Sequence, residues 1–346
     1  MKVGIVGLPR TGKTTVFSAL TGQTPDPGAP PGRTTLGTVH VRDPRLRKLH
    51  ALYPPAKLIF AEIVFADIAG AQGKKGVDRG TLTSMRDFDA FAQVLRGFPD
   101  EAGAAPDPVR EVRDLEAELV LADLDVVERK HARLLKGEKQ NFPTEKELLG
   151  KLKESLDANQ PLRLAGLTPE QTHNLSGYAF LSLKPILVVL NVPEAAVKEP
   201  APAALVQEAA DRKAGLVVLS GEVERQIAEL DEASAKDFLA DLGLAESAAQ
   251  RFIAAAYALM ELISFFTVGD DEVRAWTIRR GMEAVTAAGK IHTDLEKGFI
   301  RAEVIRHEDL LALGSEAKCR EAGKLRLEGK TYVVQDGEIM HVRFSK

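Results

Sequence analysis

Residues 1–22 read MKVGIVGLPRTGKTTVFSALTG, and the stretch GLPRTGKTT at residues 7–15 decides the fold. The short, β-branched run Lys2–Val6 predicts a buried parallel strand, and KTTVFSALTG predicts a helix directly after the glycines. Between the two, Gly7–Thr14 matches the pattern G-x-x-x-x-G-K-[ST] of phosphate-binding loops. Because a strand precedes this pattern and a helix follows it, we interpret the stretch as a phosphate loop and not as a chance glycine turn.

The spacing of the residues in this motif is suited to binding a nucleoside triphosphate. Glycines let the backbone curl so that successive N–H groups point at phosphate oxygens, and the N-terminus of the helix adds a positive dipole end. We expect the Lys13 ammonium to reach the β- and γ-phosphates and the Thr14 hydroxyl to bind Mg²⁺. The residues that we predict to hold the phosphates are Gly7, Leu8, Pro9, Arg10, Thr11, Gly12, Lys13, Thr14 and Thr15.

A second motif, Asp67-Ile68-Ala69-Gly70, follows an apolar run and matches the D-x-x-G of regulatory nucleotide hydrolases. Asp67 is expected to hold Mg²⁺ through water, and the Gly70 N–H to sense the γ-phosphate. This motif alone is weak, but beside a phosphate loop it favours a switch protein over a small-molecule kinase. The preceding loop offers Thr34 and Thr35 as the threonine that caps Mg²⁺, and we prefer Thr35, although a turn threonine without a ligand fits nearly as well.

The composition is that of an ordinary globular protein, 45% apolar and 28% charged with a formal net charge of -4. A chain of 346 residues suits two or three domains. The charge balance argues against a protein that binds nucleic acid by bulk positive charge. The single Cys319 excludes an intramolecular disulfide and suits a reducing compartment. No apolar run approaches the ~20 residues that span a bilayer, so we expect a cytoplasmic protein without a membrane partner.

Strand-like and helix-like runs alternate along the first two thirds of the chain, which predicts an α/β fold with a parallel sheet. Two charged, leucine-bearing helical runs at residues 111–136 and 144–160 predict an antiparallel hairpin inserted into that sheet. The Pro- and Gly-dense residues 23–35 predict a long loop. Beyond the apolar run at 252–264, short β segments around Gly and Asp turns predict a separate α+β module. The predicted strands are 36–43, 58–67, 88–98, 184–194, 214–224 and, in the C-terminal module, 264–269, 273–279, 299–305 and 331–344.

The base-recognition element should follow the strand at 184–194. A guanine-selective hydrolase carries N-K-x-D there, whereas this chain has Asn191-Val192-Pro193-Glu194. The missing lysine and the longer acid weaken the case for guanine. An asparagine that merely ends a strand is the alternative at this position.

Several segments together resemble the YchF / Obg-like ATPase family, and the likeness covers nearly the whole chain. They are the phosphate loop, DPRL at 43–46, FADIAG at 65–70, LSLKPILVVLNVPE at 181–194, and a C-terminal set of EVRAWTI, AAGKIHTDLEKGFIRAEVI and LRLEGKTYVVQDGEIMHVRF. The resemblance implies a P-loop NTPase G domain at 1–115 and 179–262, an inserted coiled-coil hairpin at 116–178, and a TGS domain with a β-grasp fold at 263–346. It also implies ATP binding at least as good as GTP binding, slow hydrolysis and association with ribosomes.

The same resemblance implies further site residues. The N-x-x-E element of the family falls on Asn191 to Glu194, so that Asn191, the Val192 backbone and Glu194 face the base, and Phe98 sits near the site. LSGE places Ser220 where a base-contacting S-A-K element would stand. The family replaces the water-positioning glutamine by a hydrophobic residue, and here Ala71 follows Gly70. A departure is Arg10, because the family usually reads N-V-G-K-S where this chain has Arg10-Thr11-Gly12-Lys13-Thr14.

Two hypotheses of different classes follow. The first is a monomeric, Mg²⁺-dependent ATP or GTP hydrolase that works as a slow molecular switch, with Lys13, Gly70 and Arg10 as its catalytic residues. Arg10 is either an arginine finger supplied in cis or a solvated loop residue. The second is a non-catalytic, nucleotide-regulated module that grips ribosomal RNA or protein through the hairpin and the TGS-like domain.

Overall fold

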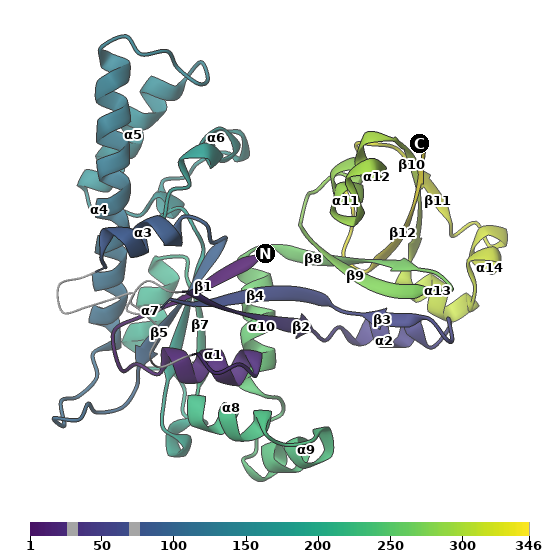
Figure 1. The fold of residues 1–346 in the computed structure, drawn as a ribbon, viewed down its shortest axis with the longest axis horizontal. Coiled ribbons are helices and arrows are strands. Elements are labelled where there is room, and N and C mark those ends of the chain that lie inside the picture. The colour runs from purple at the N-terminus through teal and green to yellow at the C-terminus, as the bar shows by residue number, and fades with distance from the viewer. Residues whose placement is uncertain (26–33, 69–76, 346) are drawn as a thin grey trace. The chain divides into compact units, whose positions relative to one another are not determined.

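The computed structural model describes residues 1–25, 34–68 and 77–345, and the chain divides into two compact units (Figure 1). The first unit comprises Met1–Thr38 and Val64–Leu259, and the second comprises Val39–Ile63 and Met260–Lys346. Part of the loop predicted at 23–35, namely 26–33, lies outside the described residues. Within the described ranges no helix combines the length and the apolar character that crossing a membrane requires.

The first unit is built on a sheet with the strand order β2-β4-β1-β5-β6-β7. The pairs β1/β4, β1/β5, β5/β6 and β6/β7 are all parallel. The central strands are continuous apolar runs because helices cover both faces of such a sheet. The strands are β1 Lys2–Val6, β2 Thr34–Val41, β4 Ala61–Ile68, β5 Ala90–Arg96, β6 Ile186–Asn191 and β7 Gly215–Leu219. The predicted α/β fold with a parallel sheet is confirmed.

Helices flank this sheet and follow its strands. The helix α1 begins directly after the glycines of the phosphate loop, as predicted, and buries Val16, Phe17 and Leu20. Asp78 caps α3 by accepting from the backbone N–H groups of Gly80 and Thr81. The helices are α1 Lys13–Thr21, α3 Arg79–Met85, α6 Pro169–Asn174, α7 Ala203–Asp211, α8 Gly221–Ala228, α9 Glu232–Asp241 and α10 Ala248–Leu259. Short 3-10 helices lie at Leu162–Leu164, Ser176–Tyr178 and Glu194–Ala196.

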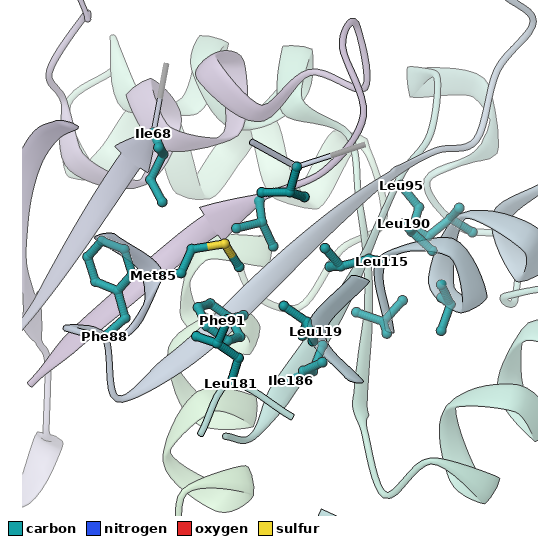
Figure 2. Close-up of a cluster of buried hydrophobic side chains, with 14 of the residues drawn as sticks. Ile68, Met85, Phe88, Phe91, Leu95, Leu115, Leu119, Leu181, Ile186 and Leu190 are labelled. Atoms are coloured by element: carbon teal, nitrogen blue, oxygen red, sulfur yellow. The ribbon is translucent and has the colours of Figure 1, made fainter. Parts of the chain in front are cut away.

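One hydrophobic core lies between the sheet and the helices α3 and α4 (Figure 2). It joins side chains that are far apart in sequence, since β4, β5 and β6 contribute to it together with the beginning of α4. Its labelled members are Ile68, Met85, Phe88, Phe91, Leu95, Leu115, Leu119, Leu181, Ile186 and Leu190. This core fixes the strands whose carboxyl ends carry the predicted site.

The inserted hairpin consists of α4, Pro108–Leu135, and α5, Glu145–Asp157, which lie side by side (Figure 1). Asp107 caps α4, and Pro108 occupies its first turn, where a missing N–H costs nothing. Buried leucines of both helices form a second core. At the root of the hairpin, Asp123 accepts hydrogen bonds from the backbone N–H groups of Leu181 and Ser182 at 2.9 and 2.7 Å. The hairpin is therefore anchored to the segment that leads into β6.

The second unit holds a mixed sheet with the strand order β11-β10-β12-β8-β9-β3. The neighbours β12 and β8 are parallel, as are β3 and β9, and the remaining pairs are antiparallel. Separate hydrophobic cores cover its two faces. The strands are β3 Lys57–Ile59, β8 Leu262–Val268, β9 Glu272–Arg279, β10 Phe299–Arg306, β11 Arg326–Glu328 and β12 Glu338–Phe344. The helices are α2 Pro44–His50, α11 Ala284–Ile291, α12 Thr293–Lys297, α13 His307–Leu313 and α14 Glu316–Glu321.

Three strand predictions differ markedly from the structure in extent. The strand predicted at 214–224 ends at Leu219, and from Gly221 the chain forms α8, which Ser220 caps. The run predicted as one strand at 58–67 is divided at Phe60 into β3 and β4, because β3 pairs with β9 while β4 pairs with β1. The hydrophobic pattern of a run indicates which residues are buried but not which strand will pair with it, so the pattern cannot reveal this division. The strand predicted at 331–344 begins only at Glu338, and before it Val333 forms a single bridge with Glu283.

Candidate functional site

At two positions of the loop between β1 and α1, the backbone has a conformation that only glycine adopts easily. Gly7 has φ 148° and Gly12 has φ 90°, both in the region where side chains are strained. A Cβ on Gly7 would lie 2.3 Å from the Val94 carbonyl oxygen, and one on Gly12 would lie 2.2 Å from Asn191 Nδ2. The loop is thus held close against the ends of β5 and β6. This is the geometry that a phosphate loop requires.

The helix α1 starts without a side-chain cap, because Gly12 occupies its N-cap position. The first backbone N–H groups of a helix have no intrahelical acceptor. Together with the helix dipole, such groups form a ready anion site. The sequence therefore places an uncapped helix end where the predicted phosphates would lie.

Lys13 lies inside this loop, where its Nζ donates to the Leu8 carbonyl oxygen at 2.7 Å. Burial lowers the pKa of the ammonium, while the negative charges of Asp67 and Glu111 oppose that shift. An ammonium has three donors, so two remain for phosphate oxygens after the bond to Leu8. Lys13 is therefore positioned as the predicted phosphate ligand.

Two of the three residues predicted for Mg²⁺, Thr14 and Asp67, meet directly. Thr14 Oγ1 donates to Asp67 Oδ2 at 3.0 Å. Burial raises the pKa of the Asp67 carboxyl, and the hydrogen bond from Thr14 and the charge of Lys13 oppose that shift. In the described part of the chain, His, Cys, Asp and Glu nowhere gather as a group of three or more that could hold a metal ion. One hydroxyl and one carboxylate fit Mg²⁺, because this ion keeps several waters and uses phosphate oxygens as further ligands.

Asn191 has both atoms of its side-chain amide engaged with the protein. Its Nδ2 donates to the Thr11 carbonyl oxygen at 2.9 Å, and its Oδ1 accepts from the Gly221 N–H at 2.9 Å. Its own carbonyl oxygen accepts from the Gly97 N–H at 2.7 Å. Asn191 therefore fastens the phosphate loop to the start of α8. The sequence analysis assigned it a contact with the base and missed this positioning role.

The other residues predicted for the base lie around Asn191. The Val192 N–H donates to the Leu219 carbonyl oxygen at 2.8 Å. Ser220 is buried and caps α8, since its hydroxyl accepts from the Val223 N–H at 3.5 Å. Glu194 is exposed at the start of a short 3-10 helix, and Phe98 follows directly on β5 and Gly97. The structure therefore gathers these residues at one edge of the sheet.

Arg10 and Thr35 lie differently from the rest of the predicted set. Arg10 has φ 67°, an unusual conformation for a residue with a side chain, and its guanidinium pairs with Glu101 in the loop after β5. Thr35 lies in β2, and among the described residues its side chain makes no hydrogen bond to Thr14 or Asp67. Gly70, Ala71 and Gln72 lie outside the described residues, so the roles predicted for Gly70 and for the water-positioning residue stay predictions.

Two buried polar residues near Lys13 were not found from the sequence. Gln93 of β5 donates from Nε2 to the Glu111 carbonyl oxygen at 2.8 Å, and its Oε1 is buried without a partner among the described residues. The Arg96 N–H donates to Glu111 Oε2 at 3.4 Å, and burial raises the pKa of the Glu111 carboxyl. Nothing in an amphipathic helix marks one glutamate as buried. That Glu111 lies close enough to Lys13 for their charges to interact is apparent only from the three-dimensional structure.

Two family models match separate parts of the chain. Residues 2–130 match the model described as 50S ribosome-binding GTPase. Residues 262–345 match the YchF GTPase C-terminal model, which is described as a protein of unknown function. The first match contains the phosphate loop and Asp67, and the second contains strands β8 to β12.

Named relatives and a solved structure match over nearly the full length. The Ribosome-binding ATPase YchF of Bacillus subtilis (strain 168) is 40% identical over 363 residues, which cover 100% of this chain and 99% of the relative. Its counterpart in Haemophilus influenzae is 40% identical and covers 99% of both chains. Obg-like ATPase 1 of Oryza sativa subsp. japonica is 35% identical, covering 100% of this chain and 92% of the relative. The structure of the Schizosaccharomyces pombe YchF GTPase has a TM-score of 0.83 and 28% identity, covering 99% of this chain and 97% of that one.

Proposed function

The chain belongs to the YchF family of P-loop nucleotide hydrolases. From that premise we propose that it is a slow, Mg²⁺-dependent ATP or GTP hydrolase that works as a molecular switch when it is bound to ribosomes. The observation that carries this proposal is the meeting of Lys13, Thr14 and Asp67 at the carboxyl ends of β1 and β4. The names of the relatives, ribosome-binding ATPases, support the ribosomal partner. Such a partner would place the protein in the cytoplasm.

In this proposal the phosphates lie along residues 7–15. The uncapped N–H groups of α1 and the Lys13 ammonium hold the β- and γ-phosphate oxygens. Thr14 and Asp67 hold Mg²⁺, which supplies positive charge for the phosphate oxygens. The Gly70 N–H senses the γ-phosphate and Thr35 joins the metal site when the triphosphate is bound. Ordering of these two segments by the triphosphate is the switch.

The choice between adenine and guanine rests on residues 191–194. We propose that the Val192 backbone, Glu194, Phe98 and Ser220 surround the base, while Asn191 holds the phosphate loop against that pocket. The lack of the guanine-selective N-K-x-D supports acceptance of ATP. The names of the relatives include both ATPase and GTPase, so the proposal retains both purines.

Arg10 is our candidate for an additional positive charge at the γ-phosphate. Its side chain and that of its partner Glu101 are 72% and 76% exposed, so water screens their ion pair. A triphosphate carries more negative charge than one carboxylate and would compete with Glu101 for the guanidinium. Arg10→Ala would then lower the rate of hydrolysis, and an unchanged rate would leave Arg10 as a solvated loop residue.

We assign the ribosomal contacts to the inserted hairpin and the C-terminal domain, with the chain as a monomer. The domain limits in this proposal are 1–115 and 179–262 for the G domain, 116–178 for the hairpin and 263–346 for the TGS domain. The parallel pair β12 and β8 inside a mixed sheet supports a β-grasp fold for that domain. The second compact unit also contains 39–63, so β3 joins the C-terminal sheet and α2 contributes Leu46 and Leu49 to its hydrophobic core.

The test is calorimetric titration of the full chain with non-hydrolysable ATP and GTP analogues in Mg²⁺, in wild type and Glu194→Asp. Saturable binding of at least one analogue is expected, with a shift toward GTP in the variant. Binding of neither purine triphosphate would overturn the proposal. Single-turnover hydrolysis with and without ribosomes then separates the switch from a non-catalytic module, for which both rates would be equally slow.

A further inference from the structure

An open cavity of about 630 Å³ lies in the first unit beside β7, which is the last strand of the sheet within the described residues. Its walls are residues 197–201, Leu216–Val218 of β7, Gly243–Leu244, and Arg251 and Ala255 of α10. This volume is within the range of sites for small molecules. None of the residues predicted to hold the nucleotide lines it. The cavity is therefore distinct from the nucleotide site.

Arg251 contributes a positive charge that the protein leaves without an acceptor. Its Nη2 is buried and has no hydrogen-bond partner within the described part of the chain. The nearby carboxylate of Glu224 is already engaged, because its two oxygens accept from the N–H groups of Ala248 and Ala249 at 2.8 and 3.1 Å. Glu224 thus caps α10 instead of pairing with Arg251. A buried donor without an acceptor is costly, so this one requires an explanation.

A second cation stands at the rim of the same cavity. Lys198 is exposed and its Nζ lies over Gly243, where a Cβ would come within 3.1 Å of it. For the described residues, no hydrogen bond or ion pair involves the Lys198 ammonium. Glu199 is the only acid in the lining, while the Glu224 carboxylate, which does not line the cavity, interacts with the charge of Arg251. The lining itself therefore carries two cations and one exposed carboxylate. The cavity therefore favours a negatively charged occupant.

The rest of the lining is apolar. Val197, Leu216, Val218 and Leu244 form the walls together with Ala255. As β7 ends the sheet, one row of its peptide groups has no strand partner and can bond to a polar atom of a ligand. A planar guanidinium matches the two oxygens of a carboxylate or phosphate. The site thus combines an oxyanion receptor with space for an apolar body.

We propose that this cavity binds a small organic anion, whose carboxylate or phosphate head group pairs with Arg251 and Lys198 and whose apolar body lies against β7 and α10. Three observations carry this inference: the Arg251 guanidinium in the cavity wall, which forms no ion pair within the described part of the chain, the rim lysine, and the cavity volume. It does not depend on nucleotide hydrolysis, because no residue of the phosphate loop takes part.

The probes for the test are naphthyl phosphate, naphthoate and the uncharged naphthol, titrated into the full chain by fluorescence. We expect saturable binding of at least one of the two anions with one site per chain, and binding of naphthol about 10-fold weaker or more. The two anionic arms distinguish a phosphate from a carboxylate ligand. The same titration in Lys13→Ala should give unchanged affinity, which separates this cavity from the phosphate loop.

Substitutions in the cavity show where on the protein the probe binds. Arg251→Gln should weaken binding of the anion about 10-fold, and Lys198→Gln about 3-fold because its ammonium is exposed. Ala255→Phe fills the cavity while keeping α10 apolar, and should abolish binding even if Arg251→Gln does not fold. The matched control is Arg279→Gln at the exposed end of β9, which removes the same charge outside the cavity and should bind as wild type does. Equal binding of naphthol and the anions, no saturable binding of either anion, or wild-type affinity in Ala255→Phe would overturn the proposal.

Discussion

Two helices begin at the same carboxyl edge of the first unit's sheet, and they begin in opposite ways. The helix α8 starts at Ser220, whose hydroxyl caps it, whereas α1 starts at Gly12 in a left-handed conformation with no side-chain cap. Asn191 bonds to both turns, through the Thr11 carbonyl oxygen and the Gly221 N–H. A capped helix satisfies a free N–H group internally, while an uncapped one keeps these groups for an external anion. In the function that we propose, the missing cap leaves the first turn of α1 free to bind phosphate, whereas the capped first turn of α8 serves as its support.

Lys13→Ala should have the largest effect, because it removes the charge that complements the uncapped helix. We expect turnover of ATP or GTP to fall about 10³-fold, as for loss of a group that stabilises developing charge. The free energy of unfolding should change little, since among the described residues the Lys13 side chain makes one hydrogen bond, to Leu8. Single-turnover kinetics measure the rate. Lys151→Ala on the exposed face of α5 is the charge-matched control, and turnover retained in Lys13→Ala would refute the role of the loop.

Gly12→Ala should come next, because a methyl group there would lie 2.2 Å from Asn191 Nδ2 in a backbone with φ 90°. We expect the free energy of unfolding to fall by about 3 kcal/mol, from backbone strain and the displaced asparagine. Urea denaturation measures it. Gly22→Ala is the matched control, since Gly22 has φ 68° with no atom within 4 Å of the added Cβ, and only the strain of about 1 kcal/mol should remain. Equal losses in the two variants would show that the contact with Asn191 is unimportant.

Asn191→Ala tests whether one side chain supports both helix starts. Truncation leaves the Thr11 carbonyl and the Gly221 N–H without their partner, so the free energy of unfolding should fall by about 2 kcal/mol. Nucleotide affinity should fall as well, because the loop loses its support. Denaturation and calorimetry on the same preparation give both values. A residue that only contacts the base would lower affinity and leave stability unchanged.

Ser220→Ala should have the smallest effect. Losing the cap of α8 should lower the free energy of unfolding by about 1 kcal/mol, the usual value for such a substitution. Ser315→Ala, which removes the equivalent cap of α14, provides the comparison and should cost a similar amount. Because we also propose that Ser220 lies beside the base, a small loss of ATP or GTP affinity should accompany the loss of stability, and unchanged affinity would leave Ser220 as a helix cap alone.

The local structure around the candidate site was predicted well, because a strand ends before Gly7 and a helix begins at Lys13. Gly7, Gly12, Lys13 and Thr14 act within one strand–loop–helix unit, and their spacing alone defines their geometry. The place of Asp67 near the end of β4 was also predicted, because the end of an apolar strand is visible in the sequence. Its role at Mg²⁺ stays a prediction. The parallel sheet followed from the alternation of strands and helices.

What the sequence did not reveal depends on contacts between distant segments. The positioning role of Asn191 arises because Thr11 and Gly221 come to its two sides, and neither is near it in the chain. Glu111 is buried beside Gln93 although its helix carries many exposed acids. The division of the run 57–68 likewise depends on partners that only the assembled sheets supply.

The division between β3 and β4 has a consequence for synthesis of the protein. Leu58 of β3 pairs with Val273 of β9, so the α2–β3 segment leaves the ribosome long before its partner exists. At about 5–20 residues per second the wait is roughly 10 to 40 seconds. During that time Leu46 and Leu49, fully buried in the finished protein, lack the neighbours Phe266 and Val273. A nascent chain that stalls before residue 260 would thus expose an apolar segment that is prone to aggregate and that chaperones would bind.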